Sequence, residues 1–438
     1  MSAPLPPGSY GLPVLGETLE WRADRLAFLR RRWRRYGRIW KSATYGQREI
    51  TMLGPEANAF MLSTHRRHFE WAGGHEIFFD RRLFGDSIFL MDGDEHQHQR
   101  GLVLPAFHGR ALRGYGETIR ALCAEYAERW AARGEIVATD ELKQLTFEVA
   151  AKLLLGAETR EQSAWLARAF DAFGRGMTAF PRWPVPWSTY GRAFRARDAL
   201  REYFRALLAR RRAAPGTDAL GMLMTAEDQA GRRLEDERIV SHLIALLLAA
   251  HDTTRSAMTW MLVELDRHPE VVERLRAELA AAGPGAAEFE ALGTLEYLDR
   301  VLKEVERLHP PISGAPRRVV EPFDFDGCHV PAGWRVYYSI LFTHMMPEIW
   351  SEPERFDPDR FAPPRSEDEK TPFSLIGFGA GPRSCIGRGF ARLEMKVMAA
   401  VLLQGYELRV LPGQDLRYDY TPTRVPRGEL RVRVTKRA

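Results

Sequence analysis

The chain of 438 residues is predicted to be mainly helical, with small β-sheets near both ends of the sequence. Apolar residues recur at helical spacing through most of residues 93–320. Alternating apolar and polar residues at 39–53, with a turn at Tyr45-Gly46-Gln47, predict a β-hairpin that follows an N-terminal helix. Short strands are predicted again between 319 and 338. A helix and strand-like segments are therefore expected at each end of a long helical region.

Glycine and proline divide that helical region into separate helices. The expected breaks are Gly109, Gly134, Gly156, residues 181–190, Pro215-Gly216 and Pro269. Residues 235–266 are predicted to form one long helix, which is buried because residues 243–250 are apolar nearly all round. The last helix is predicted at 386–403, and strand-like segments end the chain.

The composition favours a single large globular domain over residues 1–438. Length alone suggests two or three domains, but there is no linker, low-complexity block or repeat. The three cysteines argue against a disulfide framework and for a reducing compartment, so a cytoplasmic location is expected. No signal peptide or membrane anchor is evident, because the longest strongly apolar stretch is far shorter than the ~20 residues of a membrane helix.

The chain is moderately basic, with a formal net charge of +5. Five arginines surround Trp33, at positions 30, 31, 32, 34 and 35. Because acidic residues lie close by, a solvated helix face is favoured over nucleic-acid binding. Docking of an acidic protein partner is a second possibility.

One cysteine, Cys385, stands in a glycine-rich loop just before the last predicted helix. The loop reads Phe378-Gly379-Ala380-Gly381-Pro382-Arg383-Ser384-Cys385-Ile386-Gly387. Its glycines allow a bulky group to approach the backbone. The start of the helix and Arg383 favour the thiolate over the thiol. The loop predicts a single thiolate metal ligand, and the alternative is a buried structural cysteine.

A polar run, Ala249-Ala250-His251-Asp252-Thr253-Thr254, interrupts the long predicted helix. Asp and Thr are unfavourable inside a helix because their side chains compete for backbone hydrogen bonds. An exposed polar turn is one interpretation. Since the preceding residues predict a buried helix, buried Asp252 and Thr253 more readily indicate function. His251 is interpreted as a packing or salt-bridging residue.

Two further pairs share helix faces. Glu304 and Arg307 are three residues apart, and His96 and Arg100 are four apart. A metal site made of His96 and His98 is the competing interpretation, but that spacing places the two rings on different faces of a helix.

These segments, in this order, resemble the motifs of the cytochromes P450. The Cys385 loop matches the haem-binding pattern Phe-x-x-Gly-x-Arg-x-Cys-x-Gly at all six specified positions, and residues 249–254 resemble the oxygen-activation motif, with Ala250 in place of a glycine. Residues 304–307 and Pro353-Glu354-Arg355-Phe356 resemble two further elements. The start of the chain is similar to that of retinoic-acid- and steroid-modifying members. The resemblance covers nearly the whole chain and implies the cytochrome P450 fold.

The resemblance implies a haem-thiolate monooxygenase. Haem b would be held by Cys385 as the iron ligand, with Phe378 and Ala249 beside it. The family pattern assigns the haem propionates to His96, Arg100, Arg317 and Arg383, the oxygen-binding and proton-relay roles to Asp252 and Thr253, and a buried structural triad to Glu304, Arg307 and Arg355. A peroxide-driven peroxygenase and a haem-binding protein without turnover are the alternatives.

The substrate is expected to be a hydrophobic small molecule, either isoprenoid-like (a retinoid, terpenoid or steroid) or a fatty acid. Its apolar pocket is expected to include Phe78, Phe79, Phe84, Phe89, Leu246, Ile312, Gly314 and Thr421, each of which is otherwise an ordinary core position. Phe180, Trp183 and Trp187 belong to either an entrance loop or a packed surface loop. O2 and a separate ferredoxin-type donor with its reductase are implied. Arg388, Arg392 and Lys396 form either the donor's docking site or a solvated basic face.

Overall fold

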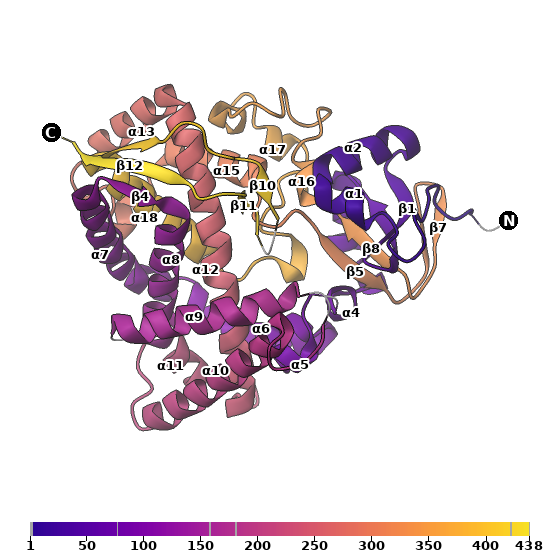
Figure 1. Cartoon of the computed structure of the whole chain (residues 1–438), viewed down its shortest axis with the longest axis horizontal. Helices are drawn as coiled ribbons and strands as arrows, with labels where there is room; N and C mark the ends of the chain where they lie inside the picture. Colours follow the sequence, from indigo (N-terminus) through magenta and orange to yellow (C-terminus); the bar gives the residue numbers. More distant parts are fainter. Residues whose placement is uncertain (1–2, 77, 157–158, 180–181, 421–422, 438) are drawn as a thin grey trace. The chain divides into compact units, whose positions relative to one another are not determined.

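The computed structural model describes residues 3–76, 78–156, 159–179, 182–420 and 423–437. They form two compact units, which the chain visits in turn, and Figure 1 labels their helices and strands. The first unit comprises Met1–Ile77, Leu90–Asp92 and Glu306–Cys385, and the second comprises Phe78–Phe89, Gly93–Val305 and Ile386–Ala438. The single-domain assignment stays a prediction.

A five-stranded sheet of order β1-β2-β8-β5-β3 organises the first unit. Its strands are β1 (Ile39–Thr44), β2 (Gln47–Met52), β8 (Arg335–Tyr338), β5 (Ala315–Val319) and β3 (Phe69–Glu70). The predicted hairpin is confirmed: β1 and β2 are antiparallel, and Tyr45 and Gly46 both have positive φ, as a tight two-residue turn requires. A second hairpin joins β6 (Phe323–Phe325) to β7 (Cys328–Val330).

Short helices surround this sheet. They are α1 (Thr18–Ala23), α2 (Arg25–Tyr36), α3 (Pro55–Ala59), η1 (Phe60–Thr64), η2 (Arg66–His68), α4 (Trp71–His75), α16 (Ile340–Thr343), η5 (Pro358–Phe361), α17 (Glu367–Lys370) and η6 (Gly381–Arg383). The core beneath the sheet is aliphatic and aromatic, including Ile50, Met52, Val336 and Ile376. Three arginines of α2 lie beside acidic partners, Arg30 beside Glu354, Arg31 beside Glu20 and Arg32 beside Glu17, as the solvated-face interpretation expects.

The second unit is mostly helical. Its helices are α5 (Arg81–Phe84), α6 (Gly93–Val103), η4 (Leu104–Phe107), α7 (Arg110–Arg133), α8 (Ala138–Leu155), α9 (Arg160–Met177), α10 (Thr189–Arg211), α11 (Ala219–Thr225), α12 (Asp236–Arg267), α13 (Pro269–Ala282), α14 (Phe289–Leu292) and α18 (Arg388–Gly405). Two short helices, η3 (Ile88–Leu90) and α15 (Glu296–Leu308), continue across a boundary between the units. Strands β4 (Glu135–Val137), β12 (Arg431–Lys436) and β9 (Tyr406–Val410) form one sheet, and β10 (Tyr418–Asp419) pairs with β11 (Val425–Pro426).

The long helix α12 forms the centre of this unit, where it packs against α8, α10 and α18 (Figure 1). Residues 243–247 are all buried, which confirms the predicted buried helix. The predicted breaks are also found: Gly109 precedes α7, Gly134 and Gly156 end α7 and α8, and Pro269 begins α13. Within the described ranges, no helix is both long and apolar enough to cross a membrane.

Candidate active site

Near-neighbour backbone hydrogen bonds shape the Cys385 loop. The Gly379 N–H donates to Ile376 O over 2.8 Å, the Ser384 N–H to Gly381 O over 3.0 Å, and the Cys385 N–H to Phe378 O over 2.8 Å. Cys385 is exposed, unlike Cys123 and Cys328, which are buried. Burial raises the pKa of both buried thiols. Cys385 is thus not the buried structural cysteine of the alternative interpretation, and its role as a thiolate ligand stays a prediction.

Two glycines in the loop have left-handed φ values, +66° at Gly379 and +64° at Gly381. A Cβ on Gly381 would lie 2.1 Å from Leu62 O, whereas a Cβ on Gly379 would find no heavy atom closer than 3.8 Å. Gly381 is therefore required by conformation and by space, and Gly379 by conformation alone.

The base of the loop is anchored by a buried histidine. The Ile376 N–H donates to His344 Nε2 over 2.9 Å, and His344 Nδ1 donates to Arg307 O over 3.1 Å. Arg307 is fully buried, and its guanidinium donates to His344 O over 2.8 Å and to Pro353 O over 2.7 Å. These contacts agree with the predicted structural role of Arg307 beneath the loop.

Arg317 and Arg383 gather over one indole ring. The Arg317 guanidinium carbon lies 4.2 Å from the Trp71 ring centre, and that of Arg383 lies 5.5 Å from it. Arg383 also donates to Asp92 Oδ1 over 2.7 Å. Burial lowers the pKa of Arg317, against the opposing effects of Tyr338 and Asp92. Two predicted propionate partners thus lie together in the first unit.

The helix that carries Trp71 lies directly on β5. Gly74 makes this possible, since a Cβ there would lie 2.5 Å from the Arg317 Cα. His75 stacks on Trp71 with ring centres 3.8 Å apart. Burial, and then the charge of Arg317, hold the pKa of His75 well below its ordinary value, so this imidazole is neutral. The Trp71 indole N–H is buried and has no hydrogen-bond partner among the described residues.

The polar run of α12 remains helical. Thr253 Oγ1 donates to Ala249 O over 2.8 Å, and Thr254 Oγ1 donates to Ala250 O over 2.9 Å, so each hydroxyl bonds one turn back along the helix. Asp252 is buried, and its Oδ1 lies 2.8 Å from Arg255 Nη2. Its Oδ2 accepts a hydrogen bond from Thr423 Oγ1 over 3.0 Å. Neither Arg255 nor Thr423 was predicted from the sequence to contact Asp252. Only the i,i+3 spacing of Asp252 and Arg255 gave a signal for the first contact.

His251 packs within the unit. Its ring meets Phe147 edge to face at 5.0 Å, and Nδ1 donates to Leu247 O over 2.7 Å. Burial lowers the pKa of His251, although the charge of Asp252 opposes the change. A neutral, packed imidazole agrees with the packing interpretation.

The cytochrome P450 family model matches residues 6–433. The chain is 34% identical to the putative cytochrome P450 120 of Synechocystis, over 99% of this chain and 97% of the relative. It is 31% identical to cytochrome P450 26B1 of Xenopus tropicalis, over 98% of this chain and 86% of the relative. The chain belongs to the cytochrome P450 family. The structure of retinoic-acid-bound cyanobacterial CYP120A1 matches all of both chains, with a TM-score of 0.91 and 33% identity. This P450 is a monooxygenase, and its fold is the P450 fold.

Members of this family carry a haem-thiolate cofactor, and the residues of this P450 fit one. Cys385 supplies an exposed sulfur in a loop that leaves space beside Gly379. Trp71 supplies a buried donor that has no acceptor within the described ranges, flanked by two guanidinium groups. A carboxylate such as a propionate would provide the missing acceptor and match the charge. Trp71 was not predicted from the sequence to contact the cofactor, because a lone tryptophan carries no such signal.

His96 and Arg100 lie on one face of α6 in the second unit. His96 is buried and Arg100 half-buried. His98 lies elsewhere on the helix, 41% exposed and 3.8 Å from Asp228. Throughout the described ranges, no group of three or more His, Cys, Asp or Glu side chains gathers to hold a metal ion. The two-histidine metal site therefore finds no support, and the propionate role of His96 and Arg100 stays a prediction.

The predicted triad is wrong in one member. Glu304 and Arg307 are fully buried on α15, but the Arg355 side chain is 64% exposed and pairs with Glu352 at 3.1 Å. Arg360 is fully buried instead, and it donates to Ser351 O over 2.7 Å and Glu367 Oε2 over 2.8 Å. Pro353-Glu354-Arg355-Phe356 is followed by Pro358-Asp359-Arg360-Phe361, so the motif occurs twice and the sequence does not distinguish the two copies.

The predicted substrate residues divide between the units. Phe79 lies 5.2 Å from Phe84 and 5.0 Å from Phe89, ring centre to ring centre, and Phe84 packs against Phe173 at 5.0 Å. Phe78 is half-buried and Leu246 is buried in the same unit. Ile312 is 40% exposed in the first unit, where Gly314 packs tightly against Tyr337. Thr421 and Phe180 lie outside the described residues. These roles stay predictions.

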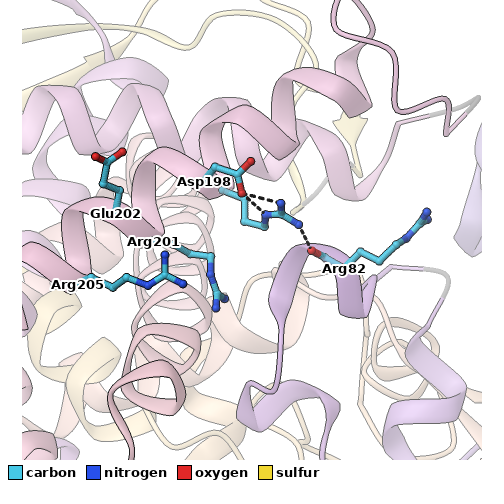
Figure 2. A pocket seen from close by; sticks show the side chains of 6 residues that line it. Arg82, Asp198, Arg201, Glu202 and Arg205 are labelled. Atoms are coloured by element: carbon cyan, nitrogen blue, oxygen red, sulfur yellow. Dashed lines mark hydrogen bonds and ion pairs between the residues drawn. The ribbon is translucent and has the colours of Figure 1, made fainter.

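A cavity of about 610 Å³ lies elsewhere in the second unit. Figure 2 shows its charged lining, which consists of Arg82 from α5 and Arg197, Asp198, Arg201, Glu202 and Arg205 from α10. Arg197 donates to Asp198 Oδ1 and to Arg82 O, and Arg201 and Arg205 both pair with Glu237. No predicted substrate residue that the structure describes lines this cavity, and its lining lacks the apolar character expected of their pocket.

The basic group after Cys385 also differs from expectation. Lys396 is buried and donates to Asp299 Oδ2 over 2.8 Å, and Arg392 donates to Asp299 Oδ1 over 2.9 Å. The proposed docking face of Arg388, Arg392 and Lys396 is therefore wrong in Lys396, because burial and the shared aspartate remove it from the surface. Trp183 and Trp187 are 65% and 77% exposed, so the segment that carries them is not a packed surface loop.

Proposed function

We propose that this P450 hydroxylates a hydrophobic, isoprenoid-like small molecule, a retinoid in particular. O2 and electrons from separate redox proteins, a ferredoxin-type donor and its reductase, serve as co-reactants. The observation that carries the proposal is the similarity to retinoic-acid-bound CYP120A1, which extends over all of both chains. A fatty acid is the competing substrate class.

Haem b is held by Cys385 as the thiolate ligand in this proposal, with Phe378 and Ala249 beside the cofactor. Arg317, Arg383 and the Trp71 N–H bind the propionate edge, together with His96 and Arg100. When bound, the haem activates O2 for insertion of one oxygen atom into a C–H bond. The glycines of the loop give the cofactor access to the sulfur, and His344 and Arg307 hold the base of the loop in place.

Asp252 and Thr253 deliver protons on the oxygen-binding side. The Thr253 hydroxyl donates to Ala249 O, and rotation about its Cα–Cβ bond frees it to donate to a different acceptor. Asp252 is the carboxylate that passes protons to this hydroxyl from solvent. The apolar side chains Phe79, Phe89 and Leu246 orient the substrate and exclude water.

Titration of the purified haem protein with retinoic acid, a steroid and a fatty acid tests the substrate class. Retinoic acid is expected to move the Soret band to shorter wavelength at the lowest concentration, and product analysis with a ferredoxin system should then show a hydroxylated retinoid. If the fatty acid alone moves the band and is oxidised, the retinoid assignment is wrong.

The reduced carbon-monoxide difference spectrum tests the ligand. A band near ~450 nm is expected for the wild type, and its loss for Cys385→Ser. Cys328→Ser is the matched control, because it changes a buried cysteine of the same unit and should retain the band. A ~450 nm band that survives in Cys385→Ser would exclude this thiolate. Turnover with H2O2 but not with electron donors would indicate the peroxygenase alternative.

A further inference from the structure

Both carboxylate oxygens of Asp252 are held by side chains. Oδ1 lies 2.8 Å from Arg255 Nη2, one helical turn further along α12. Oδ2 accepts from the hydroxyl of Thr423, 171 residues away in sequence, over 3.0 Å. The Asp252 and Arg255 side chains are only 12% and 13% exposed, and Thr423 is 3% exposed. The carboxylate is thus held from two directions in a largely dry site, where such contacts are strong.

The segment that carries Thr423 is itself fastened to α12. The next residue, Arg424, offers its carbonyl oxygen to Ser256 Oγ over 2.5 Å and to Trp260 Nε1 over 2.9 Å. Three side chains of α12, one turn apart from one another, therefore bond two consecutive residues of this segment. Thr423 cannot leave Asp252 by a small loop movement without breaking the two bonds to Arg424.

A second pair on the same helix shows that this arrangement is not simply an exposed i,i+3 ion pair. Arg267 lies 3.1 Å from Glu264, with the same spacing as Arg255 and Asp252. The Arg267 side chain is 49% exposed, however, whereas that of Arg255 is nearly buried. The Arg255 Nε–H is also buried, with no acceptor among the described residues. Because this N–H has no acceptor among those residues, the ion pair with Asp252 is the contact that holds the largely buried Arg255 guanidinium in place.

We propose that Arg255 and Thr423 are positioning residues for proton delivery by Asp252. Arg255 fixes Oδ1, and the Thr423 hydroxyl fixes Oδ2, so that the carboxylate keeps one orientation between successive proton transfers. This inference rests on the proposed role of Asp252 in the monooxygenase reaction.

Substitutions at the two positions test the proposal in the haem-bound enzyme. Thr423→Val, which keeps the side-chain shape without the hydroxyl, should lower the product formed per electron consumed by about three- to tenfold, since small misplacement of a catalytic group is costly. Hydrogen peroxide release should rise correspondingly, and the solvent deuterium isotope effect on electron consumption should change. Thr423→Ser should restore all three. Arg255→Leu should have a larger effect, with partial rescue in Arg255→Lys.

Matched controls lie on the same helix. Thr259→Val removes a buried hydroxyl that donates to Arg255 O over 2.8 Å, and Arg267→Leu removes a half-exposed arginine that forms an i,i+3 pair with buried Glu264. Both controls should leave the yield per electron and the isotope effect at wild-type values. Equal losses in Thr259→Val and Thr423→Val would overturn the proposal in favour of general damage to the helix.

A double-mutant cycle gives a readout independent of turnover. Unfolding midpoints of Thr423→Val, Asp252→Ala and the double variant are compared, and the two substitutions should be non-additive by about three- to tenfold in the unfolding equilibrium constant. Additive effects would show that the contact is absent, which overturns the inference. If coupling is present but the wild type lacks the ~450 nm band or does not turn over, the proposed function fails instead. If the wild type turns over and Thr423→Val matches it in yield and isotope effect, the positioning role fails and the function stands.

Discussion

Two neighbouring segments of the first unit share one sequence pattern and differ in environment. Pro353-Glu354-Arg355-Phe356 places its arginine side chain 64% exposed, beside Glu352. Pro358-Asp359-Arg360-Phe361 places its arginine at 0% exposure, bonded to Ser351 O and Glu367. Arg355 still contributes to the buried cluster, but through its backbone carbonyl, which accepts from Arg307 and Arg360. A local motif identifies the residue type that a cluster needs, and the tertiary partners decide which copy supplies it.

The largest difference in unfolding free energy is therefore expected between the variants Arg360→Ala and Arg355→Ala. Arg360→Ala removes a donor from three backbone carbonyls and from the Glu367 carboxylate, which keeps only its half-buried partner Arg365 as a cation. Loss of one partner of a buried ion pair costs about 3–5 kcal/mol of unfolding free energy. Arg355→Ala keeps the carbonyl and should stay within about 0.5 kcal/mol of wild type. Chemical unfolding of both variants measures the difference. Similar losses in the two variants would mean that the two copies are equivalent.

The same comparison applies to the two glycines of the Cys385 loop. Gly379→Ala and Gly381→Ala both place an L residue at left-handed φ, which costs about 1–2 kcal/mol. In Gly381→Ala the new Cβ would also collide with Leu62 O, 2.1 Å away, so its cost should exceed that of Gly379→Ala. Unfolding free energy and haem content per mole of protein should fall further for Gly381→Ala. Equal losses of unfolding free energy in the two variants would show that the positive φ alone, and not the space beside Leu62 O, requires glycine at these positions.

These pairs show which structural features can be predicted from the sequence and which cannot. The hairpin at 39–52, the buried helix α12 and the Cys385 loop depend on periodicity and on near neighbours, and all were predicted. Thr423 and Trp71 depend on partners far away in the sequence or on a missing acceptor, and the role of Arg360 depends on which of two similar segments is buried. No sequence pattern marks these features. Lys396 was misassigned for the same reason, because its position on a helix did not reveal Asp299.

Two buried glutamates, Glu394 and Glu264, are expected to affect the stability of the protein differently as the pH changes. Glu394 on α18 is fully buried, and neither carboxyl oxygen has a hydrogen-bond partner among the described residues, so burial raises its pKa well above the ordinary value. Between the lower pKa of the unfolded chain and the raised pKa of the folded protein, Glu394 therefore carries a proton in the folded state and has lost it in the unfolded state. Stability from this group is present below the unfolded pKa and declines as the pH rises toward the folded value.

Glu394→Gln should therefore gain stability relative to wild type as the pH rises above about 4.3, with a slope of at most about 1.4 kcal/mol per pH unit for one proton. Glu264→Gln is the matched control, because Glu264 is also buried but lies 3.1 Å from Arg267. That substitution removes an ion pair and should destabilise the protein near neutral pH. Unfolding curves between pH 5 and pH 8 measure both. A pH-independent difference for Glu394→Gln would mean that Glu394 is ionised in the folded protein.

The smallest expected effects come from replacing two tryptophans, Trp260 and Trp71, by phenylalanine. The buried indole N–H of Trp260 donates to Arg424 O over 2.9 Å, whereas that of Trp71 has no acceptor in the described part of the chain. Trp260→Phe should lose about 0.5–1.5 kcal/mol of unfolding free energy, the net value of one hydrogen bond, with unchanged haem affinity. Trp71→Phe should leave the stability of the haem-free protein near wild type, because none of the described residues loses a donor. Its haem dissociation constant, measured by titrating haem into the haem-free protein, should rise by about two- to twelvefold, the equivalent of the same single hydrogen bond. An unchanged dissociation constant in Trp71→Phe would remove the indole from the proposed propionate site, and a lower stability of its haem-free form would show that the N–H serves the protein alone.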